Sequence, residues 1–193
     1  MTSLNIDDAI WERIALGDKE AYAEAYRCYF QKFYNYGIKF SYDYTLIEDT
    51  VQETLLQIWE NRQIISTIQY INTYYFSAFR NKLFGKIKQS QKQKTGYSTY
   101  EPEFSVEQVI IAQEIDEELK EKLHNAIADL TSRQREAIFL RFYEGLSFEE
   151  VAIVLGITTK ATYKIVARAV EELRKLLVFD ALLLVFLFSA QKI

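Results

Sequence analysis

Apolar residues recur at helical spacing in the segment 47–60, IEDTVQETLLQIWE. The apolar set occupies positions i, i+4, i+7 and i+8: Val51, Leu55, Ile58 and Trp59. These positions share one face of a helix, so we predict that this face is part of a core. The opposite face is polar except for Leu56. From periodicity alone, Leu56 is predicted to be an isolated apolar residue on the surface.

The segment 130–177 carries the signals of consecutive helices joined by short turns. Two capping boxes open helices here: Thr131 with Gln134, and Ser147 with Glu150. Gly145 ends the first of these helices and Gly156 ends the second, which is about eight residues long. After the turn GIT, a longer helix is predicted from about residue 159. A short and a longer helix joined by a glycine-containing turn indicate a helix-turn-helix.

The second helix of such a motif enters the major groove of DNA, so its outward residues near the N-terminus are the candidate contacts. We expect six residues there: Thr159, Lys160, Thr162, Tyr163, Lys164 and Arg168. The three cations recur at i, i+4 and i+8 and form a stripe. A structural helix hairpin with a solvated basic edge is the alternative interpretation.

Positive charge is concentrated in residues 61–100. This block has no Asp or Glu and seven cations: Arg62, Arg80, Lys82, Lys86, Lys88, Lys92 and Lys94. The whole chain has a net charge of −4, so the remaining residues are strongly acidic. Six aromatic residues are interleaved with the cations: Tyr70, Tyr74, Tyr75, Phe76, Phe79 and Phe84. Rings and cations together favour a site for single-stranded nucleic acid, although we expect about half of these rings to be core. A basic linker is the alternative for the charge.

Composition favours an all-α fold with two small helical domains and a flexible linker. The 193 residues include one proline and six glycines, too few for many tight turns. The stretch GYSTYEPEFS (96–105) follows a polar run and is typical of a linker. We therefore predict four segments: a helical unit at 6–90, a linker at 91–104, a helix-turn-helix unit at 105–178, and a hydrophobic helical tail at 179–193.

The tail contains eight consecutive apolar residues, Ala181–Phe188. A helix over residues 176–190 would be about 22 Å long, shorter than the roughly 30 Å hydrocarbon core of a bilayer, and Asp180 interrupts its apolar character. We therefore predict no transmembrane span. Such a surface is unfavourable in water, so we expect the tail to dock on the second unit or on a partner protein.

Candidate catalytic and metal-binding groups are sparse. The single cysteine, Cys28, has no partner for an internal disulfide, and the lone His124 has no companion at catalytic or metal-ligand spacing, which favours a solvated surface histidine. We see no glycine-rich phosphate loop and no carboxylate cluster. We expect a protein that is not an enzyme and that needs no metal or cofactor. The N-terminus lacks a secretory pattern, which indicates a cytoplasmic location.

At this point the residues carry a resemblance to the extracytoplasmic-function (ECF) sigma factors of bacterial RNA polymerase, which join conserved regions 2 and 4 by a linker. Residues 17–37, GDKEAYAEAYRCYFQKFYNYG, are similar to region 2.1, and DTVQETLLQIW (49–59) resembles the segment D-x-V-Q-E-x-F-x-x-x-W, with Leu55 in place of Phe. YYFSAFRNKLFGKIK (74–88) resembles regions 2.3–2.4, and residues 130–158 resemble region 4. The resemblance covers residues 19–177.

The resemblance implies a role for each group of residues. Core polymerase would be bound by four residues: Asp49, Gln52, Glu53 and Leu56. A loop at 61–69 would capture a flipped base of the −10 element. The −10 element as a whole would be contacted by Asn61, Arg62, Gln63, Tyr70, Tyr74, Arg80, Asn81 and Lys82. Region 4 would read the −35 element, and an anti-sigma factor or another recruiting protein is an implied partner.

The recognition helix departs from the family pattern. Where the family often has Gly-Thr-Val-Lys-Ser-Arg, this chain has Lys-Ala-Thr-Tyr-Lys-Ile at 160–165. The family's −35 contacts therefore cannot be transferred residue by residue. Residues 132–175 contain eight cations and six anions, which predicts modest affinity for DNA from this half. Promoter choice would then rest on region 2 or on a recruiting protein.

We interpret the chain as a sigma factor that binds core RNA polymerase and directs transcription from promoter DNA. A conventional helix-turn-helix regulator of duplex DNA is the main alternative, but it leaves the aromatic basic block without a role. An enzyme acting on nucleic acid lacks a site, and a membrane-tethered adaptor rests on the tail alone.

Overall fold

The computed structural model describes residues 8–95, 102–105 and 117–176, and it divides into two compact units within residues 4–102 and 103–193. Every regular element in these described ranges is helical, so the all-α prediction is confirmed. None of the described helices combines the length and the apolar character that crossing a bilayer requires. The predicted tail at 179–193 lies outside the described residues.

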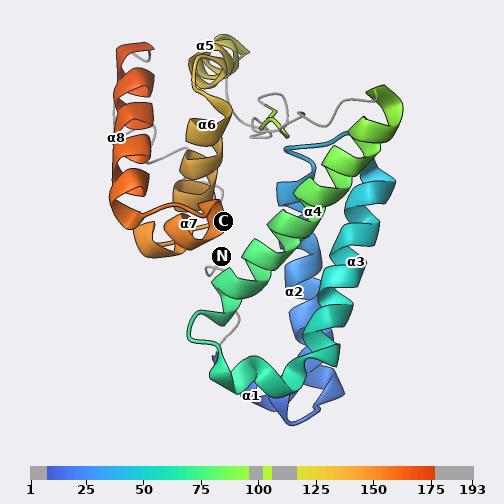
Figure 1. Ribbon diagram of the computed structural model, residues 1–193. Helices are drawn as coiled ribbons and strands as arrows, with labels where there is room; N and C mark the ends of the chain where they lie inside the picture. The colour runs from blue at the N-terminus through green and yellow to red at the C-terminus, as the bar shows by residue number, and fades with distance from the viewer. Residues whose placement is uncertain (1–7, 96–101, 106–116, 177–193) are drawn as a thin grey trace. The chain divides into compact units, whose positions relative to one another are not determined.

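The first unit contains four α-helices and one 3₁₀-helix (Figure 1). In chain order they are α1 (Asp8–Ala15), α2 (Lys19–Gly37), α3 (Tyr44–Glu60), η1 (Arg62–Thr67) and α4 (Ile71–Thr95). The Asp18 carboxylate caps α2 by accepting hydrogen bonds from the backbone N–H groups of Glu20 (2.8 Å) and Ala21 (3.1 Å). Helices α2, α3 and α4 pack against one another, while α1 packs on α2 and η1.

Aromatic rings form the core of this unit. Phe33 of α2 stacks on Phe79 of α4 with ring centroids 4.5 Å apart, and Tyr36 meets Phe76 edge to face at 4.9 Å. Gly37 ends α2 beside α3, where an added Cβ would lie only 2.6 Å from Cγ2 of Ile47. Only glycine allows this close approach, which brings α3 against the aromatic core.

The predicted core stripe of α3 is largely confirmed. Val51, Leu55 and Ile58 are fully buried, but Trp59 is half-buried at the end of the helix. The aromatic prediction for α4 is also confirmed, since three of the six rings are buried: Tyr75, Phe76 and Phe79.

The second unit contains the helix-turn-helix (Figure 1). Its elements are α5 (Glu117–Ala128), α6 (Ser132–Ile138), a π-helical turn η2 (Phe139–Tyr143), α7 (Phe148–Leu155) and α8 (Thr159–Leu176). Both capping boxes and the left-handed Gly145 (φ 72°) and Gly156 (φ 64°) are as predicted. The predicted apolar set of α7 is buried: Val151, Ala152, Val154 and Leu155. Helix α8 packs against α5, α6 and α7.

The linker predicted at 91–104 is structured at both ends. Helix α4 continues to Thr95, because lysine and glutamine extend a helix that is already formed. At the other end, Phe104 is 1% exposed and packs on Phe139, with ring centroids 5.6 Å apart. Its backbone N–H donates to Oγ of Ser132 over 2.8 Å. The predicted linker therefore ends inside the core of the second unit.

Candidate nucleic-acid and polymerase interfaces

The N-terminal turns of α8 present most of the predicted −35 residues to solvent. Thr158 caps the helix by accepting a hydrogen bond from the N–H of Ala161 over 3.2 Å. Four of the six predicted residues are exposed: Lys160, Tyr163, Lys164 and Arg168. Thr159 is half-buried. The cationic stripe is thus available to a ligand.

Thr162 is a correction to the predicted −35 set. Its side chain is fully buried, and its hydroxyl donates to the carbonyl oxygen of Thr158 over 3.3 Å. Thr162 lies four residues before Val166 and seven before Ala169, so it belongs to the inner stripe of α8. The polar side chain of Thr162 favours the surface, whereas its spacing in the sequence indicates the core.

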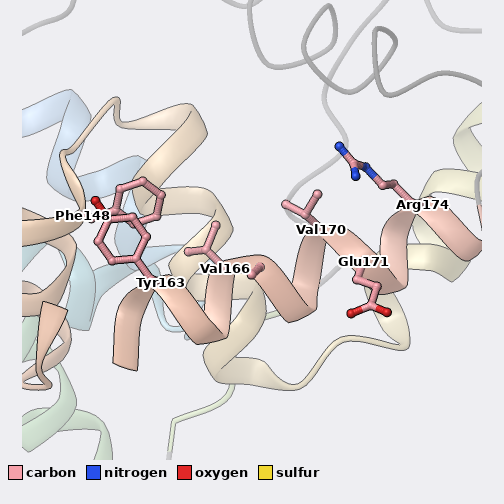
Figure 2. A pocket seen from close by; sticks show the side chains of 7 residues that line it. Phe148, Tyr163, Val166, Val170, Glu171 and Arg174 are labelled. Atoms are coloured by element: carbon pink, nitrogen blue, oxygen red, sulfur yellow. The ribbon is translucent and has the colours of Figure 1, made fainter. Parts of the chain in front are cut away.

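Tyr163 has a defined position because it stacks on Phe148 of α7, with ring centroids 4.0 Å apart. The guanidinium of Arg141 lies 4.9 Å from the centroid of the Phe148 ring. Figure 2 shows the two rings facing each other at one end of a shallow groove of about 320 Å³, with Val166 and Val170 along α8 and two charged residues beyond them. No local sequence pattern predicts this ring pair, because Phe148 and Tyr163 belong to different helices.

The predicted flipped-base loop at 61–69 is mostly helical. Arg62–Thr67 form η1, and Ile65 is buried where η1 packs on α1. Asn61 and Gln63 are exposed. Arg62 instead lies over the Trp59 ring at 4.7 Å and donates from Nη1 to the Trp59 carbonyl oxygen over 3.0 Å. Residues 62–67 are therefore helical rather than a loop, because the buried Ile65 packs this segment against the bundle, while capture of a flipped base stays a prediction.

Two exposed tyrosines stand at the beginning of α4. Tyr70 is 49% exposed and Tyr74 is 46% exposed. Between them, Oδ1 of Asn72 accepts hydrogen bonds from Nε1 of Trp11 (3.2 Å) and from the hydroxyl of Tyr29. This polar contact ties the first turn of α4 to α1 and α2. No local sequence pattern marks the half-buried Asn72 as a residue that joins helices.

The basic residues further along α4 make contacts within the bundle. The guanidinium of Arg80 lies 4.2 Å from the ring centroid of Phe84, while Asn81 is exposed. Lys82 lies 3.6 Å from a carboxylate oxygen of Glu53, and Lys86 lies 2.7 Å from the other. The hydrogen bond from Lys86, above all, lowers the pKa of the Glu53 carboxyl.

The four predicted polymerase-binding residues share the exposed face of α3. Asp49, Gln52 and Glu53 are exposed and precede Leu56 by seven, four and three positions on the same helix face, and Leu56 is 53% exposed. The sequence assigned Glu53 and Lys82 to two different binding sets, and the structure joins them as an ion pair.

Other candidate groups form no constellation within the described residues. No cluster of three or more potential metal ligands occurs there. His124, expected at the surface, is half-buried in α5, and Cys28 is half-buried and forms no disulfide within the described residues.

The described residues form two helical units, and the second contains a capped helix-turn-helix, a motif typical of DNA-binding proteins. Residues 120–173 match the family described as Sigma-70, region 4. "ECF RNA polymerase sigma factor SigL" of Mycobacterium tuberculosis (strain ATCC 25618 / H37Rv) is 28% identical over 145 residues, covering 73% of this chain and 80% of the relative. "RNA polymerase sigma factor NccH" of Alcaligenes xylosoxydans xylosoxydans is 25% identical, covering 92% and 97%.

Two solved structures share the fold. CnrH, in complex with the cytosolic domain of CnrY, aligns with a TM-score of 0.54 at 18% identity and covers 91% of this chain and 99% of its own. The sigma factor RpoE of Bartonella quintana, in complex with the anti-sigma factor NepR, aligns with a TM-score of 0.56 at 23% identity, covering 82% and 97%. The chain is therefore similar to ECF RNA polymerase sigma factors over most of its length, and the match to Sigma-70 region 4 falls on the helix-turn-helix unit.

Proposed function

We propose that this chain binds core RNA polymerase, directs it to a promoter and takes part in opening the −10 element. The observation that carries the proposal is that the region 4 match falls on a capped helix-turn-helix whose recognition helix exposes a cationic stripe. We propose an accessory role without bond-making chemistry, exercised in the cytoplasm, where RNA polymerase acts.

The first unit is the proposed −10 reader. The aromatic side chains of Tyr70 and Tyr74 are accessible for stacking, and the basic block follows directly on the same helix. Stacking of a base on an aromatic ring contributes roughly 1–3 kcal/mol. Two such contacts offset part of the cost of unpairing the duplex. Asn61, Gln63 and Asn81 are exposed and remain proposed contacts, whereas Arg62 would first have to leave Trp59.

The exposed face of α3 is the proposed polymerase interface. An apolar side chain among acidic and amide groups suits a partner surface with a small apolar pocket inside a cationic rim. Leu56, which periodicity alone leaves as a scattered surface residue, then has a specific role.

The second unit is the proposed −35 reader. Lys160, Lys164 and Arg168 are placed to contact phosphates or base edges, and the Tyr163 hydroxyl can donate to a phosphate oxygen. Residues 132–175 contain eight cations and six anions, a small positive excess. We therefore propose that region 2 or a recruiting protein supplies part of the affinity for promoter DNA. RpoE was solved with an anti-sigma factor, and we propose a partner of that kind for this chain.

Multi-round run-off transcription tests the proposal. Core RNA polymerase is supplied with this chain and a linear template carrying a promoter mapped from transcript starts after overexpression. We expect discrete transcripts that require both the chain and the promoter. A conventional regulator would instead bind duplex promoter DNA without core polymerase and would alter transcription only when another sigma factor is present. That pattern would reject the proposal.

A further inference from the structure

One carboxylate in the first unit joins the proposed polymerase face of α3 to the basic block of α4. Oε1 of Glu53 accepts a hydrogen bond from Nζ of Lys86 over 2.7 Å, and Oε2 lies 3.6 Å from Nζ of Lys82. The Glu53 side chain is 52% exposed, whereas the two lysine side chains are 23% and 28% exposed. Two partly buried cations therefore converge on one accessible anion.

The position of this carboxylate has a consequence for DNA binding. A backbone phosphate is also an anion with oxygen acceptors, so it would seek the same two ammonium groups. A phosphate approaching either lysine would be repelled by the carboxylate unless Glu53 moved away. Lys82 and Lys86 are two of the seven cations in the acid-free block, so one carboxylate engages two of these seven cations in the free protein.

We propose that Glu53 is an internal competitor for the DNA backbone, which holds Lys82 and Lys86 in the free protein and releases them when a cationic side chain of core polymerase engages it. This inference rests on the proposed function, because it takes α3 as the polymerase face. The coupling is reciprocal: if polymerase binding increases affinity for DNA, DNA binding increases affinity for polymerase by the same factor. Free sigma factor would then bind stray single strands weakly.

The test uses the full chain with the substitution Glu53→Gln, which keeps the side-chain size and removes the charge. Binding to a fluorescently labelled oligo-dT strand is followed by fluorescence anisotropy between about 50 and 200 mM salt. We expect the affinity of the free protein to rise about two- to five-fold, the range of an exposed ion pair. The slope of log affinity against log salt should steepen by about 0.7 for each lysine released.

A matched control is Glu48→Gln, which makes the same charge change at an exposed position on α3 that has no ion pair within the described residues. For Glu48→Gln we expect a smaller gain in affinity for the oligonucleotide and an unchanged slope of log affinity against log salt. The double variant Glu53→Gln/Lys86→Gln should lose about half of the added slope, because Lys82 is still released. An equal gain for Glu48→Gln, or an unchanged slope for Glu53→Gln, would overturn the competitor role.

The second part of the proposal, engagement of Glu53 by polymerase, is tested by measuring the affinity of the labelled chain for core RNA polymerase. We expect Glu53→Gln to weaken this affinity while it strengthens binding to the oligonucleotide. A gain for DNA with no loss for polymerase would overturn the coupling. Run-off transcription by the wild-type chain separates failure of the proposed function from failure of this inference. If the wild-type chain gives no transcript, the proposed function fails. If it gives transcripts and Glu53→Gln changes neither DNA binding nor polymerase binding, only this inference fails.

Discussion

At the scale of single residues, one amide oxygen links three helices. Oδ1 of Asn72 accepts from Trp11 of α1 and from Tyr29 of α2, and both donors belong to side chains that are at most 2% exposed. The amide lies between Tyr70 and Tyr74 in the chain, so it sets the position of the two rings that we propose to stack on bases. Buried donors are costly when they lose their acceptor.

We expect Asn72→Ala to lower the free energy of unfolding of the first unit by about 1–3 kcal/mol, because it leaves these donors without their partner. Urea unfolding followed by tryptophan fluorescence measures this directly, since both tryptophans, Trp11 and Trp59, belong to the first unit. The matched control, Asn81→Ala, removes an exposed amide on the same helix and should change stability by no more than about 0.5 kcal/mol. Equal stability of the two variants would contradict the structural role of Asn72.

At the scale of elements, the chain leading into the helix-turn-helix unit is part of that unit. Phe104 comes from a stretch rich in turn-forming residues, yet its ring packs on Phe139 and its N–H is held by Ser132 at the first residue of α6. A buried phenylalanine stabilises far more than a solvated linker residue does. The second unit therefore begins before α5.

We expect Phe104→Ala to destabilise the second unit by about 3 kcal/mol or more, the usual cost of removing a buried phenylalanine ring. Far-UV circular dichroism should show part of the helical signal lost at lower urea concentration, while the tryptophan transition of the first unit stays in place. The exposed neighbour provides the control, Glu103→Ala, which should leave both transitions unchanged. If the circular dichroism of Phe104→Ala changed with urea concentration as that of the wild-type chain does, this ring would not be part of the core.

At the scale of the whole molecule, the two units offer different chemistry to DNA. The first unit exposes aromatic rings next to cations, which suits unpaired bases. The second exposes cations on a recognition helix, which suits duplex DNA. The contributions of the two units to transcription should therefore respond differently when the −10 element is already open.

We expect Tyr70→Ala/Tyr74→Ala to reduce run-off transcription from a linear duplex promoter about ten-fold or more, since roughly 1–3 kcal/mol is lost for each base. A template with a pre-melted −10 region should restore most of this activity, because the unpairing cost is already met. Lys160→Ala/Lys164→Ala should reduce transcription equally on both templates. If the pre-melted template restored transcription by the lysine variant, the assignment of −10 opening to the first unit alone would be contradicted.

The beginnings of α6, α7 and α8 and the end of α7 follow from the sequence alone, whereas α5 and the π-helical turn η2 were not predicted. Capping boxes, turn glycines and apolar stripes act between residues within about four positions of each other, so Ser147, Glu150 and Gly156 marked α7 without knowledge of any other helix. The same local rule predicts that Thr162 is buried, because it lies four residues before the buried Val166. Polarity outweighed spacing in that prediction.

Only the tertiary structure decided which distant residues meet. Glu53 and Lys86 are 33 residues apart, Phe104 and Ser132 are 28 apart, and Trp11 and Asn72 are 61 apart. Charge and periodicity identify such residues as candidates, but a contact exists only when two helices pack at one particular register. For this reason the sequence determined most of the elements and the family resemblance, whereas packing decided that one carboxylate pairs with two cations of the basic block.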